Sequence, residues 1–349
     1  MAHKGFSIEY SKINAMNTLA TRISRENIFP YLGVIFLGFL VYMLPLMSPS
    51  GKVLSLATTG LVFAISSASL GFLWGQCGQL TLAHAAIFGI GGYAAAICAK
   101  HFDLGFLYAL PFSIGAGLVC GAMVALPSLR TRGPYFLILT FAIGEVISVI
   151  EMRLESITGG INGITTLPGT QQFLGLHLSQ RADYYCIVVI FATIVFLILC
   201  GLMRSRWGVL LRGLRENSDL ATSLGANVAK HRIIVFAVSG AIAGLAGQLY
   251  VYHVKFIAPE LFTSHLSIIF LLVVLLGGKS YLLGPALGSL VYVFMPEFIG
   301  LSPILSQIVF GALLILMILT APGGLLSLIN RAIVWQKSEI PSKDIGIIK

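Results

Sequence analysis

Two ionisable side chains, His84 and Glu145, lie inside apolar segments of the sequence. A charged side chain that faces lipid costs at least about 2.5 kcal/mol, so Glu145 should face the interior of a helix bundle or a wet cavity. We interpret Glu145 as part of a route or gate through a membrane, with a buried structural carboxylate as the alternative. For His84 we expect a neutral packing histidine, and titration or a bond to Glu145 are the alternatives.

A polar loop of 29 residues, 204–232, carries six Lys and Arg between two long apolar segments. Within this loop the run from Asp219 to Gly225 predicts a short amphipathic helix that is ended by glycine. Such a helix can sit in a cleft on a partner protein and move with it. The alternative is a solvated loop whose positive charge only orients the chain in a membrane.

Enzyme chemistry has little support in the sequence. No polar segment brings together a nucleophile, a base and an orienting group. The five cysteines lack metal-ligand spacing and lie in or beside apolar segments, where they act as small apolar residues. The phosphate-binding pattern GxxxxGK(S/T) does not occur, so the chain is not expected to hold nucleotide. We therefore expect neither an enzyme nor a metal site.

The composition decides which elements must position these residues. Apolar residues make up 57% of the chain, charged residues make up 10%, and the mean hydropathy is +0.93, which a single water-soluble core cannot accommodate. Apolar runs of about 20 residues predict an all-α, polytopic transmembrane helix bundle. Its ten predicted spans are 28–47, 53–74, 81–99, 104–126, 135–154, 184–203, 233–254, 262–278, 281–300 and 303–320.

The basic residues predict the orientation of this bundle, because cytoplasmic loops of membrane proteins are enriched in Lys and Arg. With ten spans and both termini cytoplasmic, most of the 22 Lys and Arg lie on the cytoplasmic side. We therefore divide the chain into a cytoplasmic arm, 1–27, a transmembrane domain, 28–325, and a cytoplasmic tail, 326–349. The arm is polar, and no cleavable signal peptide is expected.

Glycine interrupts several of the predicted spans. Four pairs are spaced four residues apart, namely Gly71 with Gly75, Gly117 with Gly121, Gly240 with Gly244, and Gly284 with Gly288. This spacing lets helix backbones touch, as in ordinary close packing. The segments 75–95 and 262–290 combine short apolar runs with Gly or Pro, which predicts discontinuous helices whose free backbone groups line a cavity.

Five stretches occur in a fixed order between about residue 53 and residue 325. They are GQCGQLTLAHAAIFGIGGY (75–93), RTRGPYF (130–136) leading to Thr140 and Glu145, TGGINGI (158–164), REN (215–217) through Gly225, and AGLAG (243–247). In this order they resemble the LivM-type permease subunits of branched-chain amino acid ABC importers. Because the likeness covers loops as well as helices, it is more specific than shared hydrophobicity.

The resemblance implies a permease subunit of the bacterial inner membrane that moves leucine, isoleucine or valine. The implied partners are two ABC ATPase subunits, which bind ATP and Mg, a second homologous permease and an extracytoplasmic substrate-binding protein. The chain itself is expected to bind no cofactor and no nucleic acid. Coupling to the ATPases is implied for the loop residues Arg215, Glu216, Asp219, Ala221 and Gly225.

Two further groups of residues become candidates. His84, Thr140 and Glu145 are candidates for the translocation pathway. Gly159, Gly160 and Asn162 lie in an outer loop, where they form either a plain turn or a docking or entrance element for the binding protein.

Other functional classes stay open at this point. A secondary transporter driven by protons or sodium is suggested by Glu145 and His84, and it would need no ATPase. A membrane scaffold or channel would use the long loop as an interaction platform. Within the importer class, urea or short amides are alternative substrates, because selectivity can reside in the external binding protein.

Overall fold

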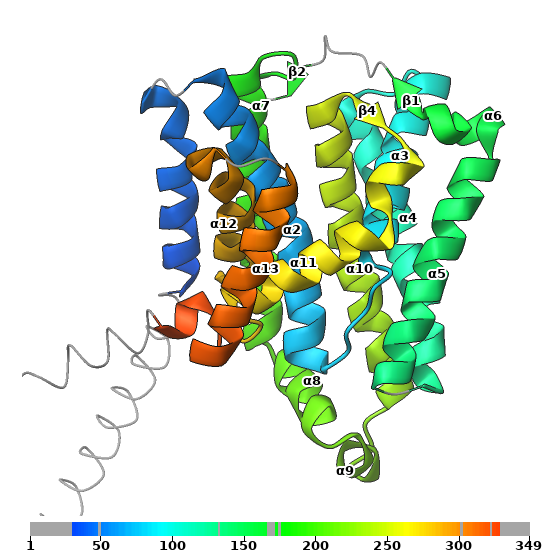
Figure 1. Ribbon diagram of the computed structural model, residues 1–349. Coiled ribbons are helices and arrows are strands. Elements are labelled where there is room, and N and C mark those ends of the chain that lie inside the picture. Colours follow the sequence, from blue (N-terminus) through cyan, green and yellow to red (C-terminus); the bar gives the residue numbers. More distant parts are fainter. Residues whose placement is uncertain are drawn as a thin grey trace, which may run out of the picture.

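The computed structural model describes residues 30–47, 50–131, 133–165, 172–173, 176–300, 303–321 and 323–328. The predicted arm, 1–27, lies outside the described residues, as does the predicted tail, 326–349, beyond residue 328. Most of the described elements are helices that stand side by side in a bundle (Figure 1).

The long helices follow one another along the chain with short connections. They are Pro30–Leu46, α2 (Gly51–Cys77), α3 (His84–His101), α4 (Phe106–Ala125), α5 (Pro134–Arg153), α7 (Arg181–Arg204), α10 (Val228–Val254), α11 (Ser264–Gly277), α12 (Gly284–Ile299) and α13 (Pro303–Thr320). The short helices are η1 (Leu44–Met47), η2 (Leu126–Leu129), α6 (Glu155–Thr158), η3 (Gly160–Asn162), α8 (Arg206–Glu216), α9 (Ser218–Ser223) and η4 (Pro259–Phe262).

Six helices in the described part of the chain are long and apolar enough to cross a membrane, and two shorter apolar helices, Pro30–Leu46 and Ile308–Met317, accompany them. This confirms the all-α polytopic bundle. Each of the ten predicted span ranges contains a helix, although the boundaries differ by several residues. The number of helices that cross the membrane stays a prediction.

Both segments that were predicted to be discontinuous contain a break between two helices, whereas a cavity lined by their backbone groups stays a prediction. The chain leaves α2 after Cys77 and runs through residues 78–83 without helical structure before α3 begins. A second break separates α11 from α12, where Gly278 has a φ of 105° that favours glycine. Figure 1 shows α11 lying obliquely across the middle of the bundle between the steeper α2 and α10.

Glycine pairs bring the helix backbones of the core together, as predicted. A Cβ added to Gly117 of α4 would collide with the carbonyl oxygen of Gly240 in α10, and one added to Gly288 of α12 would collide with the carbonyl of Val273 in α11. At Gly75 of α2 the colliding atom would be the carbonyl oxygen of Lys279. These contacts place α10 against α4, and α12 against α11, at distances that a larger side chain would prevent.

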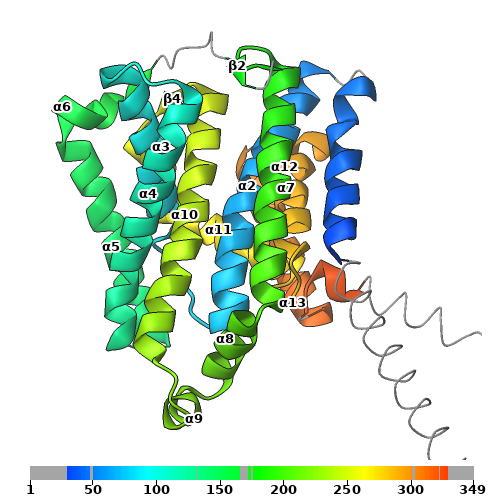
Figure 2. The ribbon, with the colours of Figure 1, turned by 180° about the vertical axis from the view of Figure 1, so that it is seen from behind.

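Four short strands lie at the end of the bundle that is opposite α9 (Figures 1 and 2). β1 (Ile164–Thr165) pairs antiparallel with β4 (Phe256–Ile257), and β2 (Gln172–Phe173) pairs antiparallel with β3 (Leu176–His177). The pairing of β1 with β4 joins the segment after α5 to the segment after α10.

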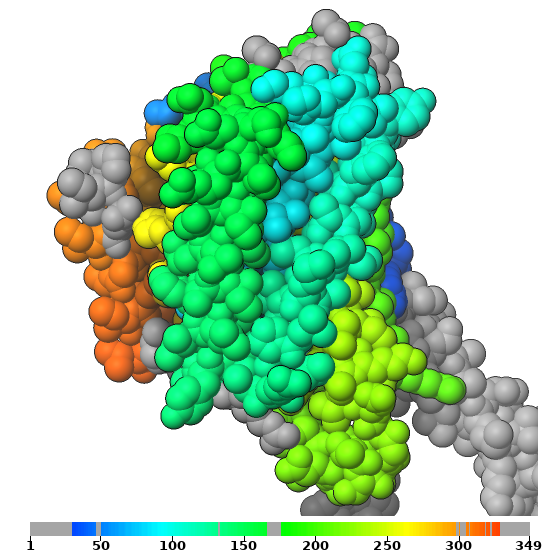
Figure 3. Space-filling view, turned by 90° about the vertical axis from the view of Figure 1, so that its right-hand side faces the viewer, coloured from blue at the N-terminus to red at the C-terminus, as the bar shows by residue number. Residues whose placement is uncertain are grey.

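One face of the bundle is formed by α5 and α4, and the chain around α9 and the start of α10 projects below them (Figure 3). Only 28% of the apolar window of α5 is buried in the structure, against 72% for α2. Large apolar side chains on α5, such as Tyr135, Ile138 and Val146, are exposed. The outer face of α5 is therefore open to lipid or to another membrane helix.

Candidate functional site

The predicted coupling loop, 204–232, folds into the two helices α8 and α9 (Figure 2). Ser205 caps α8, because its hydroxyl accepts a hydrogen bond from the amide of Gly208 at 3.2 Å. One side of α8 packs against the bundle through the buried Leu211 and Leu214. The loop thus has a fixed attachment to the membrane helices.

Two arginines of α8 bind the end of α2. The Nη1 of Arg212 donates to the Oε1 of Gln76 at 2.8 Å and to the carbonyl oxygen of Met203 at 2.9 Å. The Nη1 of Arg215 donates to the carbonyl oxygen of Gly75 at 2.5 Å. The last carbonyls of a helix lack partners within the helix and carry partial negative charge, so arginine is well suited to this place. These bonds tie α8 to the point where α2 ends.

Arg215 was singled out from the sequence, whereas Arg212 and Gln76 were not chosen as site residues. Arg212 and Gln76 are 136 residues apart in the sequence, so no local pattern predicts that they are in contact. The neighbouring Glu216 forms a 3.8 Å ion pair with Arg215 and is well exposed, so this pair contributes little stability.

The short glycine-ended helix predicted from Asp219 to Gly225 is present as α9. Asn217 caps it, because its Oδ1 accepts hydrogen bonds from the amides of Asp219 at 3.1 Å and Leu220 at 2.9 Å. Gly225 ends it with a φ of 90°. Ala221 is buried, so it attaches α9 to the rest of the protein.

The outer side of α9 presents apolar groups to solvent. Leu220 is 56% exposed and Leu224 is 80% exposed. Because α9 projects beyond the ends of the long helices, these side chains lie at the tip of the molecule (Figures 1 and 2). An apolar tip of this kind is typical of a surface that docks into a partner protein.

The return from α9 to α10 is also fixed by side chains. The Nε1 of Trp207 donates to the Nδ1 of His231 at 3.2 Å, which joins α8 to the start of α10. The buried Arg232 donates from Nη1 to the carbonyl oxygen of Ser128 in η2 at 2.9 Å. The pair α8 and α9 is therefore held at both ends.

The non-helical segment 78–83 enters the bundle and is held there by side chains. The Oγ1 of Thr140, on α5, accepts a hydrogen bond from the amide of Leu82 at 3.0 Å. The hydroxyl of Thr81 accepts from the amide of Ala83 at 3.1 Å, and Ser267 of α11 accepts from the amide of Ala85 at 2.9 Å. Backbone donors at the start of α3 are thus satisfied inside the protein.

His84 is the first residue of α3, at the start of its predicted span, 81–99. Its Nε2 donates to the carbonyl oxygen of Ser66 at 3.1 Å and lies 3.0 Å from the Oγ of Ser69, and the side chain is fully buried. Ser69 lies roughly 12 Å along the helix axis from the end of α2 at 1.5 Å per residue. Segment 78–83, which is not helical, carries the chain into the bundle before α3 begins.

Glu145 lies on α5, half-buried, and its Oε1 accepts a short hydrogen bond from the hydroxyl of Ser264. Ser264 is the first residue of α11, so the carboxylate also lies at the positive end of that helix. The structure thus assigns to Glu145 a contact with α11, and to His84 contacts with α2. Thr140 thus joins α5 to the break between α2 and α3, and Glu145 joins α5 to the start of α11.

The outer-loop candidates lie at the end of the bundle opposite α9. Gly159 and Gly160 have φ values of 77° and 58°, and a Cβ on Gly159 would collide with the carbonyl of Gly163. The hydroxyl of Thr158 accepts from the amide of Gly160 at 3.2 Å. The two glycines therefore form a tight turn, and Asn162 is exposed beside it.

One buried acid was not chosen from the sequence. Glu151 of α5 is 6% exposed, and neither of its carboxyl oxygens has a hydrogen-bond partner among the described residues. The hydroxyls of Tyr93 and Ser148 are buried without partners as well. A second acid six residues after Glu145 on the same apolar helix was the available signal.

Comparison with known proteins agrees with this arrangement. The family described as branched-chain amino acid transport system, permease component, matches residues 52–318. The chain is 28% identical over 305 residues to the high-affinity branched-chain amino acid transport system permease protein LivM of Escherichia coli (strain K12), covering 81% of this chain and 71% of that protein. A probable branched-chain amino acid transport permease protein LivM of Methanocaldococcus jannaschii is 32% identical over 226 residues, covering 60% of this chain and 65% of that protein.

The family match includes α2 to α13 almost completely, so it contains the helix breaks, the loop with α8 and α9, and the glycine contacts of the core. The chain is a multi-pass membrane protein and belongs to the family of branched-chain amino acid transport system permease components.

Proposed function

We propose that this chain is the permease subunit of an ATP-driven importer for leucine, isoleucine and valine in the inner membrane. Its named relatives are branched-chain amino acid transport permeases, which supports this substrate class. The complex would contain two ABC ATPase subunits, a second homologous permease and an extracytoplasmic substrate-binding protein. We further propose ten spans, with both termini and the α9 end on the cytoplasmic side.

The observation that carries the proposal is the attachment of α8 and α9. The exposed Leu220 and Leu224 offer a surface for an ATPase, and Arg212 and Arg215 connect that surface to the end of α2. Directly after α2 comes segment 78–83, whose amide at Leu82 is bound by Thr140 of α5. A displacement of α9 by a partner therefore has a continuous path of contacts to the helix breaks.

The translocation route is proposed to pass along α5, near Thr140 and Glu145. A zwitterionic amino acid needs donors for its carboxylate and acceptors for its ammonium group, and the ends of broken helices supply both. The second permease would cover the open face of α5. Glu145→Gln keeps the size of the side chain and removes the charge, so it should abolish uptake while assembly stays normal.

The test is uptake of radiolabelled leucine into proteoliposomes that contain the complete complex. ATP-dependent uptake that stops when Asp219 or Gly225 is changed, while ATP hydrolysis continues, would support coupling through α9. Gradient-driven uptake by the purified chain without any ATPase would instead show the secondary transporter. Competition by urea or short amides, and not by isoleucine or valine, would reassign the substrate.

A further inference from the structure

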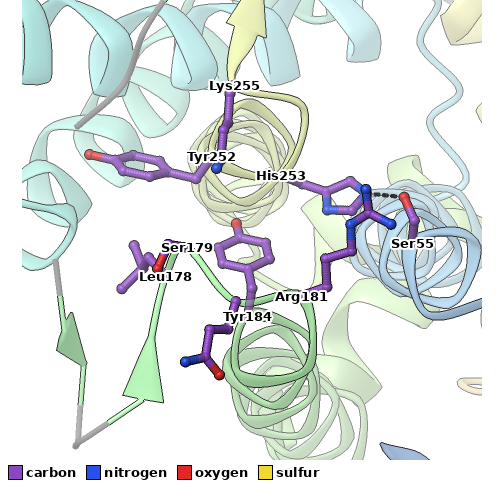
Figure 4. A pocket seen from close by; sticks show the side chains of 9 residues that line it. Ser55, Leu178, Ser179, Arg181, Tyr184, Tyr252, His253 and Lys255 are labelled. Atoms are coloured by element: carbon purple, nitrogen blue, oxygen red, sulfur yellow. Dashed lines mark hydrogen bonds between the residues drawn. The ribbon is translucent and has the colours of Figure 1, made fainter. Parts of the chain in front are cut away.

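A small cavity lies at the end of the bundle opposite α9, between α2, α7 and α10 (Figure 4). Its volume is about 250 Å³, which is less than the usual range for drug-sized ligands and enough for one polar group with several waters. Arg181, the first residue of α7, and Lys255, directly after α10, both line it. Ser55 of α2 lines the cavity as well.

The lining of this cavity is cationic. No acidic residue lines it, and among the described residues neither Arg181 nor Lys255 is within ion-pair distance of a carboxylate. Asp183, in the first turn of α7, does not line the cavity and accepts a hydrogen bond from the amide of His177 at 2.9 Å, while Glu297 pairs with Lys52 at 2.5 Å. The first turn of α7 adds the partial positive charge of a helix N-terminus.

The walls between the two cations are ordered by hydrogen bonds and ring contacts. The Nε2 of His253 lies 3.2 Å from the Oγ of Ser55, and its ring stacks on Tyr184 with the centroids 6.0 Å apart. The hydroxyl of Tyr184 donates to the carbonyl oxygen of Leu249 at 2.5 Å. Figure 4 shows Arg181 beside His253, and Lys255 above the ring of Tyr184.

Lys255 ends α10 with a φ of 59°, the left-handed conformation in which glycine usually ends a helix. Its side chain and that of Arg181 are both exposed, so the two cations can be reached from outside the bundle.

The charges also decide between two kinds of carboxylate. A free amino acid carries an ammonium group that Arg181 and Lys255 repel, and the cavity has no acid to bind it. A side-chain carboxylate of a protein brings the negative charge alone. We propose that this cavity receives an Asp or Glu side chain of the extracytoplasmic binding protein when that protein docks, an inference that rests on the function proposed above.

The experiment measures binding of the leucine-loaded binding protein to the complete importer in nanodiscs. We expect Arg181→Gln and Lys255→Gln each to weaken binding by roughly 10-fold, because each removes one charge-assisted hydrogen bond. The conservative changes Arg181→Lys and Lys255→Arg should keep most of the affinity. The matched control is Lys100→Gln, an exposed cation near the same end of the bundle that does not line the cavity.

Salt gives an independent measurement on the unaltered protein. Binding should weaken as NaCl rises, and this dependence should be smaller in the double variant of Arg181 and Lys255. Equal affinity in the double variant and in the control would overturn the proposal, as would loss of free leucine binding with docking intact. Failure of any ATPase or binding protein to associate with the unaltered chain would instead refute the proposed function itself.

Discussion

Replacing Arg212 by methionine should uncouple ATP hydrolysis from transport. The change removes two hydrogen bonds from a charged donor, to Gln76 at 2.8 Å and to Met203 at 2.9 Å. Such bonds contribute about 1.5–3 kcal/mol each, and because Arg212 is only half-buried we use the lower value, about 3 kcal/mol in total. Methionine keeps the aliphatic part of the side chain, so packing of α8 should change little.

A loss of about 3 kcal/mol corresponds to about 100-fold in the equilibrium that holds α8 on the end of α2. Arg215 and the buried Leu211 and Leu214 stay in place and retain part of the contact. We therefore expect leucine transported per ATP hydrolysed to fall about 10-fold in proteoliposomes, with ATPase activity maintained. Arg206→Met, on an exposed arginine of the same helix, is the matched control. Equal transport per ATP in both variants would refute the mechanical role of Arg212.

Three further changes test other parts of the structure. Gly225→Ala should cost about 1–2 kcal/mol at a φ of 90° and lower the leucine transported per ATP hydrolysed while the ATPase still co-purifies, whereas Gly213→Ala, in open space within α8, should leave transport per ATP unchanged. Thr140→Val should lower leucine uptake by leaving a buried amide without an acceptor, and Thr140→Ser should restore it. Gly117→Ala should lower the Tm of the purified protein, because the added methyl group forces α4 away from α10. Gly115 faces open space, so Gly115→Ala should leave the Tm unchanged, and equal Tm values for the two variants would contradict the packing.

The bundle was predictable from the sequence because lipid imposes simple rules on a chain. Hydrophobic length gives the helices, and glycine spacing gives their close contacts, as at Gly117 and Gly240. The short helix ended by Gly225 was predictable for a similar reason, since helix termination is a local property. These features depend on neighbouring residues and on the solvent.

The depth of His84 and the partners of Arg212 were not predictable in the same way. A non-helical segment and a helix can both carry an apolar chain into a membrane, so hydropathy could not show that α3 begins beside Ser66 and Ser69 of α2. The partners of Arg212 and Thr140 lie on distant parts of the chain. Contacts of this kind arise only when the chain folds. The sequence shows no more of them than a polar residue, such as Gln76 or Thr140, within an apolar helix.

The order of these contacts supports the proposed coupling between the loop, 204–232, and the break after α2. α8 is bound to the last turn of α2 by side chains, and the backbone continues from there into segment 78–83 with no helix to absorb a displacement. The amide of Leu82 in that segment donates to Thr140 of α5. Glu145, further along α5, accepts a hydrogen bond from Ser264 at the start of α11. Packed helices transmit a small shift because they cannot compress, whereas a segment without helical hydrogen bonds can change its course. The proposed coupling through α9 needs these two properties in this order, with the rigid helices α8 and α9 on the outside and the non-helical segment next to the bundle interior.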